Sequence, residues 1–149
     1  MTLFKLVPSL ALCQQLKATG FPQDTALAWY PEHCDDYEAP APASLWLDEW
    51  KRIAEGIPVV CVREEMEDHE SLCAAPTAEE MEEWLMTRDF FSKRAATIQI
   101  AYRAVNDDGV DYVGRYFVTA LNGGDEVIGQ AEAVTRITAL AALVLEMAR

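Results

Sequence analysis

Apolar residues recur at the three- and four-residue spacing of an amphipathic helix in four parts of the chain. The predicted helices span residues 10–19, 45–55, 77–86 and 130–147. Ser9 precedes the first helix as an N-cap, and Gly20 follows it as a residue that tolerates the left-handed conformation at a helix end. Thr77 and Glu80 give the third helix a capping box at its start. The spacing of the second segment favours a helix over a strand.

Four shorter segments are rich in β-branched and aromatic residues and predict strands. They span residues 25–30, 57–62, 97–105 and 110–119. The last two flank a stretch with hairpin-turn chemistry, so we expect an antiparallel pair joined at Asp108 and Gly109. Pro58 cannot donate a ladder hydrogen bond, so it confines its strand to a sheet edge or delays the strand's start. Elements in this order predict an α+β fold in which a small, largely antiparallel sheet is packed by helices.

Chain length and the final helix indicate one domain with its own core. At 149 residues the chain has the common size of a single domain, so residues 1–149 are predicted to form one α+β domain with an acidic middle segment at 32–89. The second half of the last predicted helix is apolar almost all the way round and includes Leu140, Leu143, Val144 and Met147. Such a helix either lies at the centre of the core or contributes to a subunit interface, so we expect a monomer or a homodimer.

Negative charge is concentrated in the middle of the chain. The net charge is −13, and residues 32–89 carry the excess, with 17 acidic and four basic residues. This field repels nucleic-acid phosphates and argues against direct binding of nucleic acid. The acidic residues either only keep the protein in solution or form a face for a basic protein partner. The candidate interaction residues are the densest run: Glu64, Glu65, Glu67, Asp68 and Glu70.

Cysteine usage and hydropathy bear on the cellular compartment. The four cysteines, Cys13, Cys34, Cys61 and Cys73, lie far apart in a chain large enough to fold without disulfides. This favours free thiols in a reducing cytoplasm, although an even count also permits two disulfides. No apolar run reaches the roughly 18 residues of a membrane span. We therefore expect a cytoplasmic protein that is not embedded in a membrane.

Two pairs of histidine and cysteine residues are the candidates for chemistry. They are His33 with Cys34 and His69 with Cys73, which could supply zinc ligands or a cysteine–histidine nucleophile pair. Adjacent residues rarely bind one ion together, and the spacing matches no CxxC or HExxH motif. The glycines form no phosphate-binding loop either. We therefore assign no catalytic, cofactor-binding or metal-binding residue from the sequence, and we expect no cofactor.

Three short motifs and the Ala-rich closing helix carry a family resemblance. The motifs are LCQQLK at residues 12–17, GFPQDT at residues 20–25 and APTAEE at residues 75–80. In this order they resemble a group of small uncharacterised proteins from phages, prophages and bacterial genomic islands. The motifs mark a helix exit, a strand entry and a capping box, so the resemblance implies no activity and carries over no catalytic residue.

Two functions from different classes are compatible with the sequence. The leading hypothesis is a non-enzymatic accessory protein, such as a phage-derived modulator, that binds a basic protein through an acidic surface. Its extreme form is a nucleic-acid mimic that occupies a DNA-binding groove. The alternative is a small hydrolase or metal-dependent enzyme that uses the region around His33, Cys34, His69 and Cys73.

Overall fold

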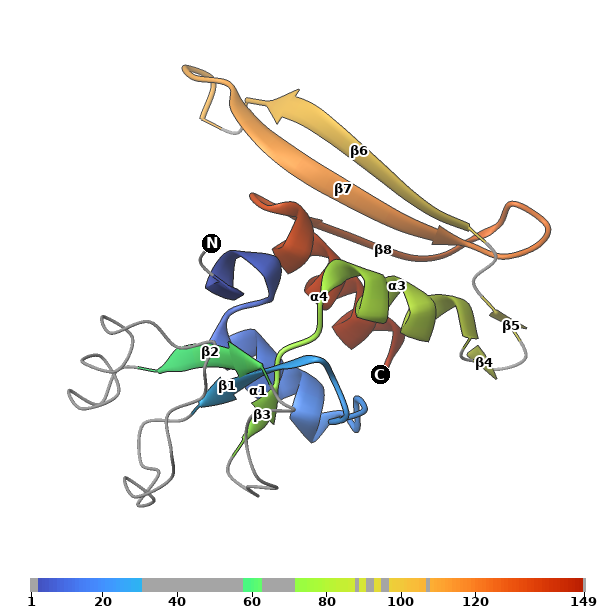
Figure 1. The fold of residues 1–149 in the computed structure, drawn as a ribbon. Coiled ribbons are helices and arrows are strands. Elements are labelled where there is room, and N and C mark those ends of the chain that lie inside the picture. The colour runs from blue at the N-terminus through green and yellow to red at the C-terminus, as the bar shows by residue number, and fades with distance from the viewer. Residues whose placement is uncertain are drawn as a thin grey trace, which may run out of the picture. The chain divides into compact units, whose positions relative to one another are not determined.

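The computed structural model describes residues 3–30, 58–62, 72–87, 89–90, 93–94, 97–106 and 108–148. It confirms the predicted α+β class, because helices accompany small antiparallel sheets (Figure 1). The contacts gather in two compact units, Met1–Thr77 and Ala78–Arg149, and each unit is described by itself below. The helix predicted at 45–55 lies outside the described residues.

Helix α1 of the first unit spans Leu10–Ala18 and follows a short 3-10 helix at Leu3–Leu6. Its start confirms the predicted N-cap, because Ser9 Oγ accepts a hydrogen bond from the backbone N–H of Leu12 at 3.3 Å. This bond satisfies one of the N–H groups that a first helical turn leaves without an intrahelical acceptor. The local sequence therefore decides where the helix begins.

The end of α1 also follows its local sequence. Gly20 has a φ of 90° and donates from its N–H to the Lys17 carbonyl at 3.1 Å. The N–H of Phe21 donates to the Leu16 carbonyl at 3.0 Å. Together these two bonds form a Schellman motif, and both Phe21 and Leu16 are buried. The chain therefore turns back at the helix end and places Phe21 against it.

The first unit contains a three-stranded antiparallel sheet with the order β2-β1-β3. The strands are β1 at Leu27–Tyr30, β2 at Val59–Val62 and β3 at Cys73–Ala74. Trp29 lies opposite Val60 on one side and opposite Cys73 on the other. Strand β2 begins after Pro58 and lies at the sheet edge, as predicted from that proline. The core of this unit includes a cluster of Val7, Cys13, Leu27, Val60, Cys73 and Ala75.

Helix α3 opens the second unit and spans Ala78–Thr87, which confirms the helix predicted from the capping box at Thr77. Its apolar face is buried, as the spacing predicts, and consists of Met81, Trp84 and Leu85. Acidic residues in its first turn lie at the positive end of the helix dipole. A short pair of two-residue strands follows, with β4 at Asp89–Phe90 and β5 at Lys93–Arg94.

The second unit also contains a three-stranded antiparallel sheet, with the order β6-β7-β8. The strands are β6 at Thr97–Val105, β7 at Val113–Leu121 and β8 at Val127–Ala133. The predicted antiparallel hairpin is confirmed, but its second strand begins at Val113 and not at residue 110. Asp108 is responsible, because its carboxylate accepts the N–H groups of Val110 and Asp111 and folds these residues into the loop.

Helix α4 spans Arg136–Met147, so the helix predicted at 130–147 is wrong in its first six residues. Gln130 lies in β8, opposite Thr119 of β7, and this pairing outweighs the helix propensity of an Ala-rich sequence. Thr135 then caps the helix, because its Oγ1 accepts from the Thr138 N–H at 3.3 Å. The burial predicted for the second half of the helix is confirmed for Leu140, Leu143, Val144 and Met147.

Candidate functional site

The cross-strand register sorts the residues of sheet β6-β7-β8 onto two sides. Ile100 lies opposite Val118, and Val118 lies opposite Ala131, so these three residues share one side. Gly129 belongs to the same side, and a Cβ atom built there would overlap Met147 Sδ of α4. We call this the helix-facing side, because α4 packs on it against β7 and β8 (Figure 1).

Helix α4 covers only part of the helix-facing side. Val118 and Ala120 of the central strand are fully buried. On β6, the residues of the same side include Ile100, which is 36% exposed, and Tyr102, which is 65% exposed. The cover by α4 therefore ends between β7 and β6, which are one strand spacing, about 4.8 Å, apart. As a result, β6 presents apolar side chains to solvent on the side that forms the core under α4.

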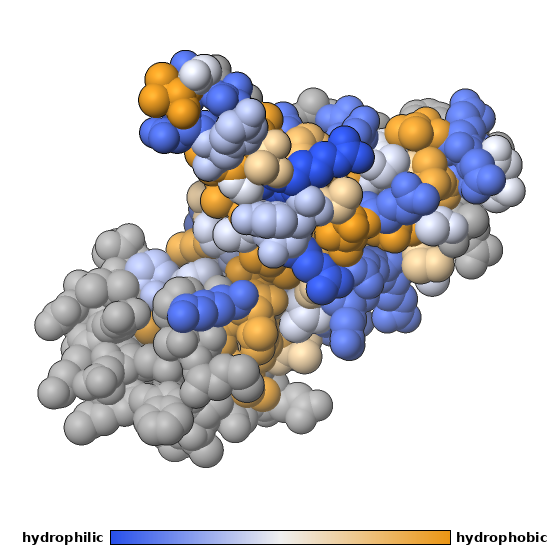
Figure 2. Space-filling view, turned by 90° about the horizontal axis from the view of Figure 1, so that it is seen from above, coloured by the Kyte–Doolittle hydropathy of each residue, from blue (hydrophilic) through white to orange (hydrophobic). Residues whose placement is uncertain are grey.

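Large exposed apolar side chains gather on the β6–β7 hairpin. Among the described residues, nine side chains are of this kind, and five of them belong to this hairpin. These five are what we call the hairpin surface: Ile100 and Tyr102 on the helix-facing side, Val110 and Tyr112 in the loop, and Val113 on the other side, opposite Val105. Figure 2 shows apolar and hydrophilic residues side by side at the projecting loop end of the hairpin, at the upper left. Because exposed apolar clusters mark interaction sites, this surface is the candidate functional site.

Tyr102 is held in place by the neighbouring strand. Its ring pairs with that of Tyr116, with centroids 4.8 Å apart and an angle of 55° between the ring planes. A Cβ atom built on Gly114 would overlap the Tyr102 hydroxyl, so the glycine lets the ring lie against the backbone of β7. An aromatic side chain positioned in this way loses little conformational freedom when it binds a partner.

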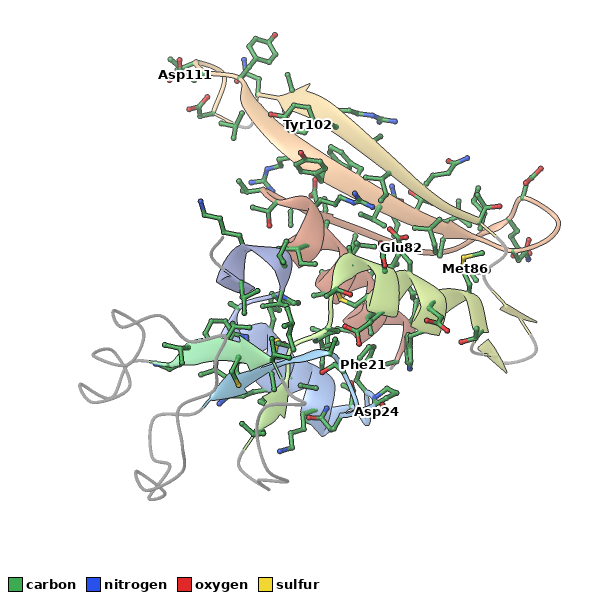
Figure 3. The ribbon with its side chains drawn as sticks, in the orientation of Figure 1. Phe21, Asp24, Glu82, Met86, Tyr102 and Asp111 are labelled. Atoms are coloured by element: carbon green, nitrogen blue, oxygen red, sulfur yellow. The ribbon has the colours of Figure 1, made fainter. Side chains whose placement is uncertain are left out.

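The loop between β6 and β7 places carboxylates beside the hairpin surface. The N–H groups of Asp111 and Val110 hold the pKa of the Asp108 carboxyl below its usual value, because both donate hydrogen bonds to it. Asp108 is therefore ionised at neutral pH. Asp111 is exposed next to Tyr112, and it lies at the loop end of the hairpin, as does Tyr102 (Figure 3). The loop end of the hairpin surface thus carries two acidic side chains.

The other side of the sheet has a different chemistry. Arg103 lies directly opposite Arg115, and the Arg103 guanidinium is 5.4 Å from the centroid of the Phe117 ring. Glu132 of β8 lies opposite Phe117. The two sides of one hairpin therefore differ, with Ile100 and Tyr102 on the helix-facing side and two arginine side chains beside the exposed Val113 on the other.

The described cysteines lie in the first unit and are buried. Cys13, Cys61 and Cys73 are free thiols, which confirms that prediction for these three. Burial, and to a smaller extent the nearby Cys73, raises the pKa of Cys13 to about 12. Burial also raises the pKa of Cys73, against the opposing effect of Lys17. Because the thiolate is the nucleophile, a protonated and buried Cys73 does not fit the catalytic role in the enzyme hypothesis.

The other residues singled out in the sequence lie outside the described residues. They are His33, Cys34, His69 and the acidic run Glu64, Glu65, Glu67, Asp68 and Glu70. Their roles stay predictions. In the part of the chain that the structure describes, no group of three or more His, Cys, Asp or Glu side chains could hold a metal ion. No described helix has the length and apolar character needed to cross a membrane.

Comparisons with family models, with curated proteins and with solved structures find no match to this chain. The geometry of the chain therefore carries the functional argument. Sequence reasoning did not identify the hairpin surface, because alternation along residues 97–105 predicts a half-buried strand. A signal was present nonetheless, since Val110, Tyr112 and Val113 follow a turn sequence directly and cannot all point into one core.

Proposed function

We propose that this chain is a non-enzymatic accessory protein that binds another protein with a basic surface. The hairpin surface is the observation that carries the proposal. It places three exposed apolar side chains on a regular pair of antiparallel strands and two more, Val110 and Tyr112, in the loop that joins them, with Tyr102 already positioned against Gly114 and Tyr116. Aromatic side chains of this kind are enriched at the centres of protein interfaces.

Charge supports a basic partner. The chain has a net charge of −13, and the ionised Asp108 and the exposed Asp111 border the hairpin surface. Lysine and arginine pack their aliphatic stems on apolar surface and keep their charged ends free. Such side chains would lie across Val110 and Tyr112 and place their charges near the two carboxylates. The acidic run at residues 64–70 is proposed as a further contact of the same sign.

The experiment compares three variants with the unmodified protein in affinity capture, followed by a binding titration with the captured protein. The test form carries Val110→Ser and Tyr112→Ser, which remove two exposed apolar side chains at the loop end of the hairpin. A charge form carries Asp111→Asn. The control form carries Val127→Ser, which removes an exposed apolar side chain at the opposite end of the sheet.

We expect a partner rich in Lys and Arg that binds the unmodified protein and the Val127→Ser form equally. The double variant should lose at least about tenfold in affinity, and Asp111→Asn should lose less. Added salt should weaken binding, because exposed charges are screened. An affinity that is unchanged in the double variant, or that does not respond to salt, would contradict the proposal. So would the absence of any partner that depends on Val110 and Tyr112.

A further inference from the structure

The two edge strands of sheet β6-β7-β8 differ in how well they are protected from pairing with another strand. Strand β8 has seven residues, carries Glu132, meets β7 with a register shift at Leu121 and lies against α4. Strand β6 has nine residues and contains no proline. Six of its nine residues are exposed, and among the described residues no strand pairs with its outer edge. Natural edge strands usually carry charge, proline or bulges that prevent edge pairing, and β6 has little of this protection.

The sequence of β6 is complementary to itself in the antiparallel direction. Two copies that meet with Ala101 opposite Ala101 pair all nine residues, from Thr97 opposite Val105 to Val105 opposite Thr97. On the helix-facing side, Ile100 of each copy then lies opposite Tyr102 of the other. Aliphatic–aromatic cross-strand pairs of this type stabilise antiparallel sheets.

Charge is compatible with the same register. The single charged residue of β6 is Arg103, and in this arrangement it lies opposite Gln99 of the second copy. No like charges meet across the new strand pair. The small side chain of Ala101 lies at the two-fold axis, where each residue meets its own copy.

We propose that β6 pairs antiparallel with β6 of a second copy of this chain, centred on Ala101, and forms a continuous six-stranded sheet. This arrangement encloses the part of the helix-facing side that α4 leaves open, because Ile100 and Tyr102 of both copies come together there. Val110 and Tyr112 lie in the loop beyond the paired strands, so the dimer leaves them available. The inference goes beyond the proposed function, because it assigns Ile100 and Tyr102 of the hairpin surface to the dimer and leaves Val110 and Tyr112 for the partner.

Opposite charges placed at the two-fold axis test the register directly. Ala101→Glu and Ala101→Lys each place like charges face to face, and each should weaken self-association by at least about tenfold. An equal mixture of the two variants should recover the affinity of the unmodified protein or exceed it, since Glu then faces Lys. Gln130→Glu places the same charge on the opposite edge of the same sheet and should leave self-association unchanged.

A second pair of variants avoids the axis and uses an exposed residue. Gln99→Arg places a charge opposite Arg103 of the second copy and should weaken the dimer, whereas Gln99→Glu should strengthen it. Analytical ultracentrifugation over a range of protein concentration measures all forms, and circular dichroism confirms that each is folded. Added salt should strengthen the dimer, because it screens the repulsion between two acidic chains.

The outcomes separate this inference from the proposed function. A chain that stays monomeric at all concentrations, a mixture that fails to recover, or a dimer weakened by Gln130→Glu would each overturn the β6 pairing. A monomer that still binds a basic protein would remove the dimer and leave the proposed function standing. Loss of partner binding in the Gln99→Arg form, with no self-association in the unmodified protein, would mean that a foreign strand occupies β6, and would also overturn self-pairing.

Discussion

Sheet β2-β1-β3 buries Val59, Val60 and Cys61 almost completely, whereas sheet β6-β7-β8 leaves six of the nine residues of β6 exposed. Both sheets are antiparallel and three-stranded, so strand pairing does not explain the difference. In the second sheet the burial follows α4, which covers β7 and β8 and leaves Ile100 and Tyr102 of β6 partly in solvent. The same architecture serves as core in one unit and as both core and surface in the other.

This difference in burial places the described thiols in the core of one unit and the accessible aromatic side chains in the other. The thiols of Cys13 and Cys73 lie in the core of the first unit, where burial keeps them protonated. The tyrosines at 102 and 112 are accessible in the second unit and offer contact area. The interaction role proposed above uses the accessible side chains of the second unit.

The largest predicted effect tests whether α4 holds the covered part of the second sheet. Leu140 is fully buried in α4, so Leu140→Ala should lower the free energy of unfolding by about 2–5 kcal/mol. Val110 is 78% exposed, so Val110→Ala should change it by no more than about 0.5 kcal/mol. Urea unfolding followed by circular dichroism measures both. Similar losses for the two variants would remove the distinction between covered and open parts of this sheet.

Local signals in the sequence predict the elements whose ends are decided locally. Ser9 and Gly20 bracket α1, and Thr77 precedes α3, because caps depend on neighbours three or four residues away. Alternation gives the bounds of β6 at Thr97–Val105 as predicted. These parts of the fold need no knowledge of tertiary contacts.

Tertiary contacts decide what the sequence did not predict. The QAEA segment at residues 130–133 favours a helix by composition, and only pairing with β7 makes it a strand. Likewise, alternation in β6 identifies one apolar side, but the position of α4 decides that Ile100 and Tyr102 stay exposed. The candidate site was not predicted for this reason, because its exposure depends on which strands α4 packs against.

A smaller effect tests how closely α4 packs on β8. A Cβ atom at position 129 would overlap Met147 Sδ and approach Leu143 Cδ1 to 3.1 Å, so Gly129→Ala should lower the free energy of unfolding by about 1–3 kcal/mol. The matched control is Gly123→Ala, where nothing lies within 4 Å of the added atom. The same urea titration measures the difference. Equal stability of the two variants would mean that α4 does not pack closely on β8. The sheet would then not have separate covered and open parts.

The first unit is tested by its response to alkaline pH. The pKa of Cys13 is raised from 9.0 to about 12, so between these values the unfolded chain loses a proton that the folded chain retains. The unfolded state then binds fewer protons, and stability falls as pH rises from about 9 towards 12. The slope from one thiol approaches about 1.4 kcal/mol per pH unit once it is ionised in the unfolded chain.

Other groups also titrate in this range, so the measurement is a difference of slopes. Unfolding free energies are determined at several pH values from 8 to 10.5 for the unmodified protein and for Cys13→Ala. The variant should show the shallower decline, because the buried thiol is absent. Equal slopes of unfolding free energy against pH for the two proteins would show that Cys13 is not buried. That result would contradict the contrast between a buried first unit and an accessible second one.

The smallest effect concerns the ion pair that links the two helices of the second unit. Arg136 Nη2 lies 3.0 Å from Glu82 Oε1, and the two side chains are 52% and 30% exposed (Figure 3 labels Glu82). Solvent screens charges at such exposure, so Glu82→Gln should cost no more than about 1 kcal/mol. Glu83→Gln removes an exposed carboxylate from the same helix and serves as the control.

A double-mutant cycle with Arg136→Gln, repeated at low and high salt, isolates the pairwise energy. That energy should shrink as salt rises and stay below the loss caused by Leu140→Ala. An ion-pair energy as large as that loss would mean that charge, and not burial under α4, holds the helices on this sheet.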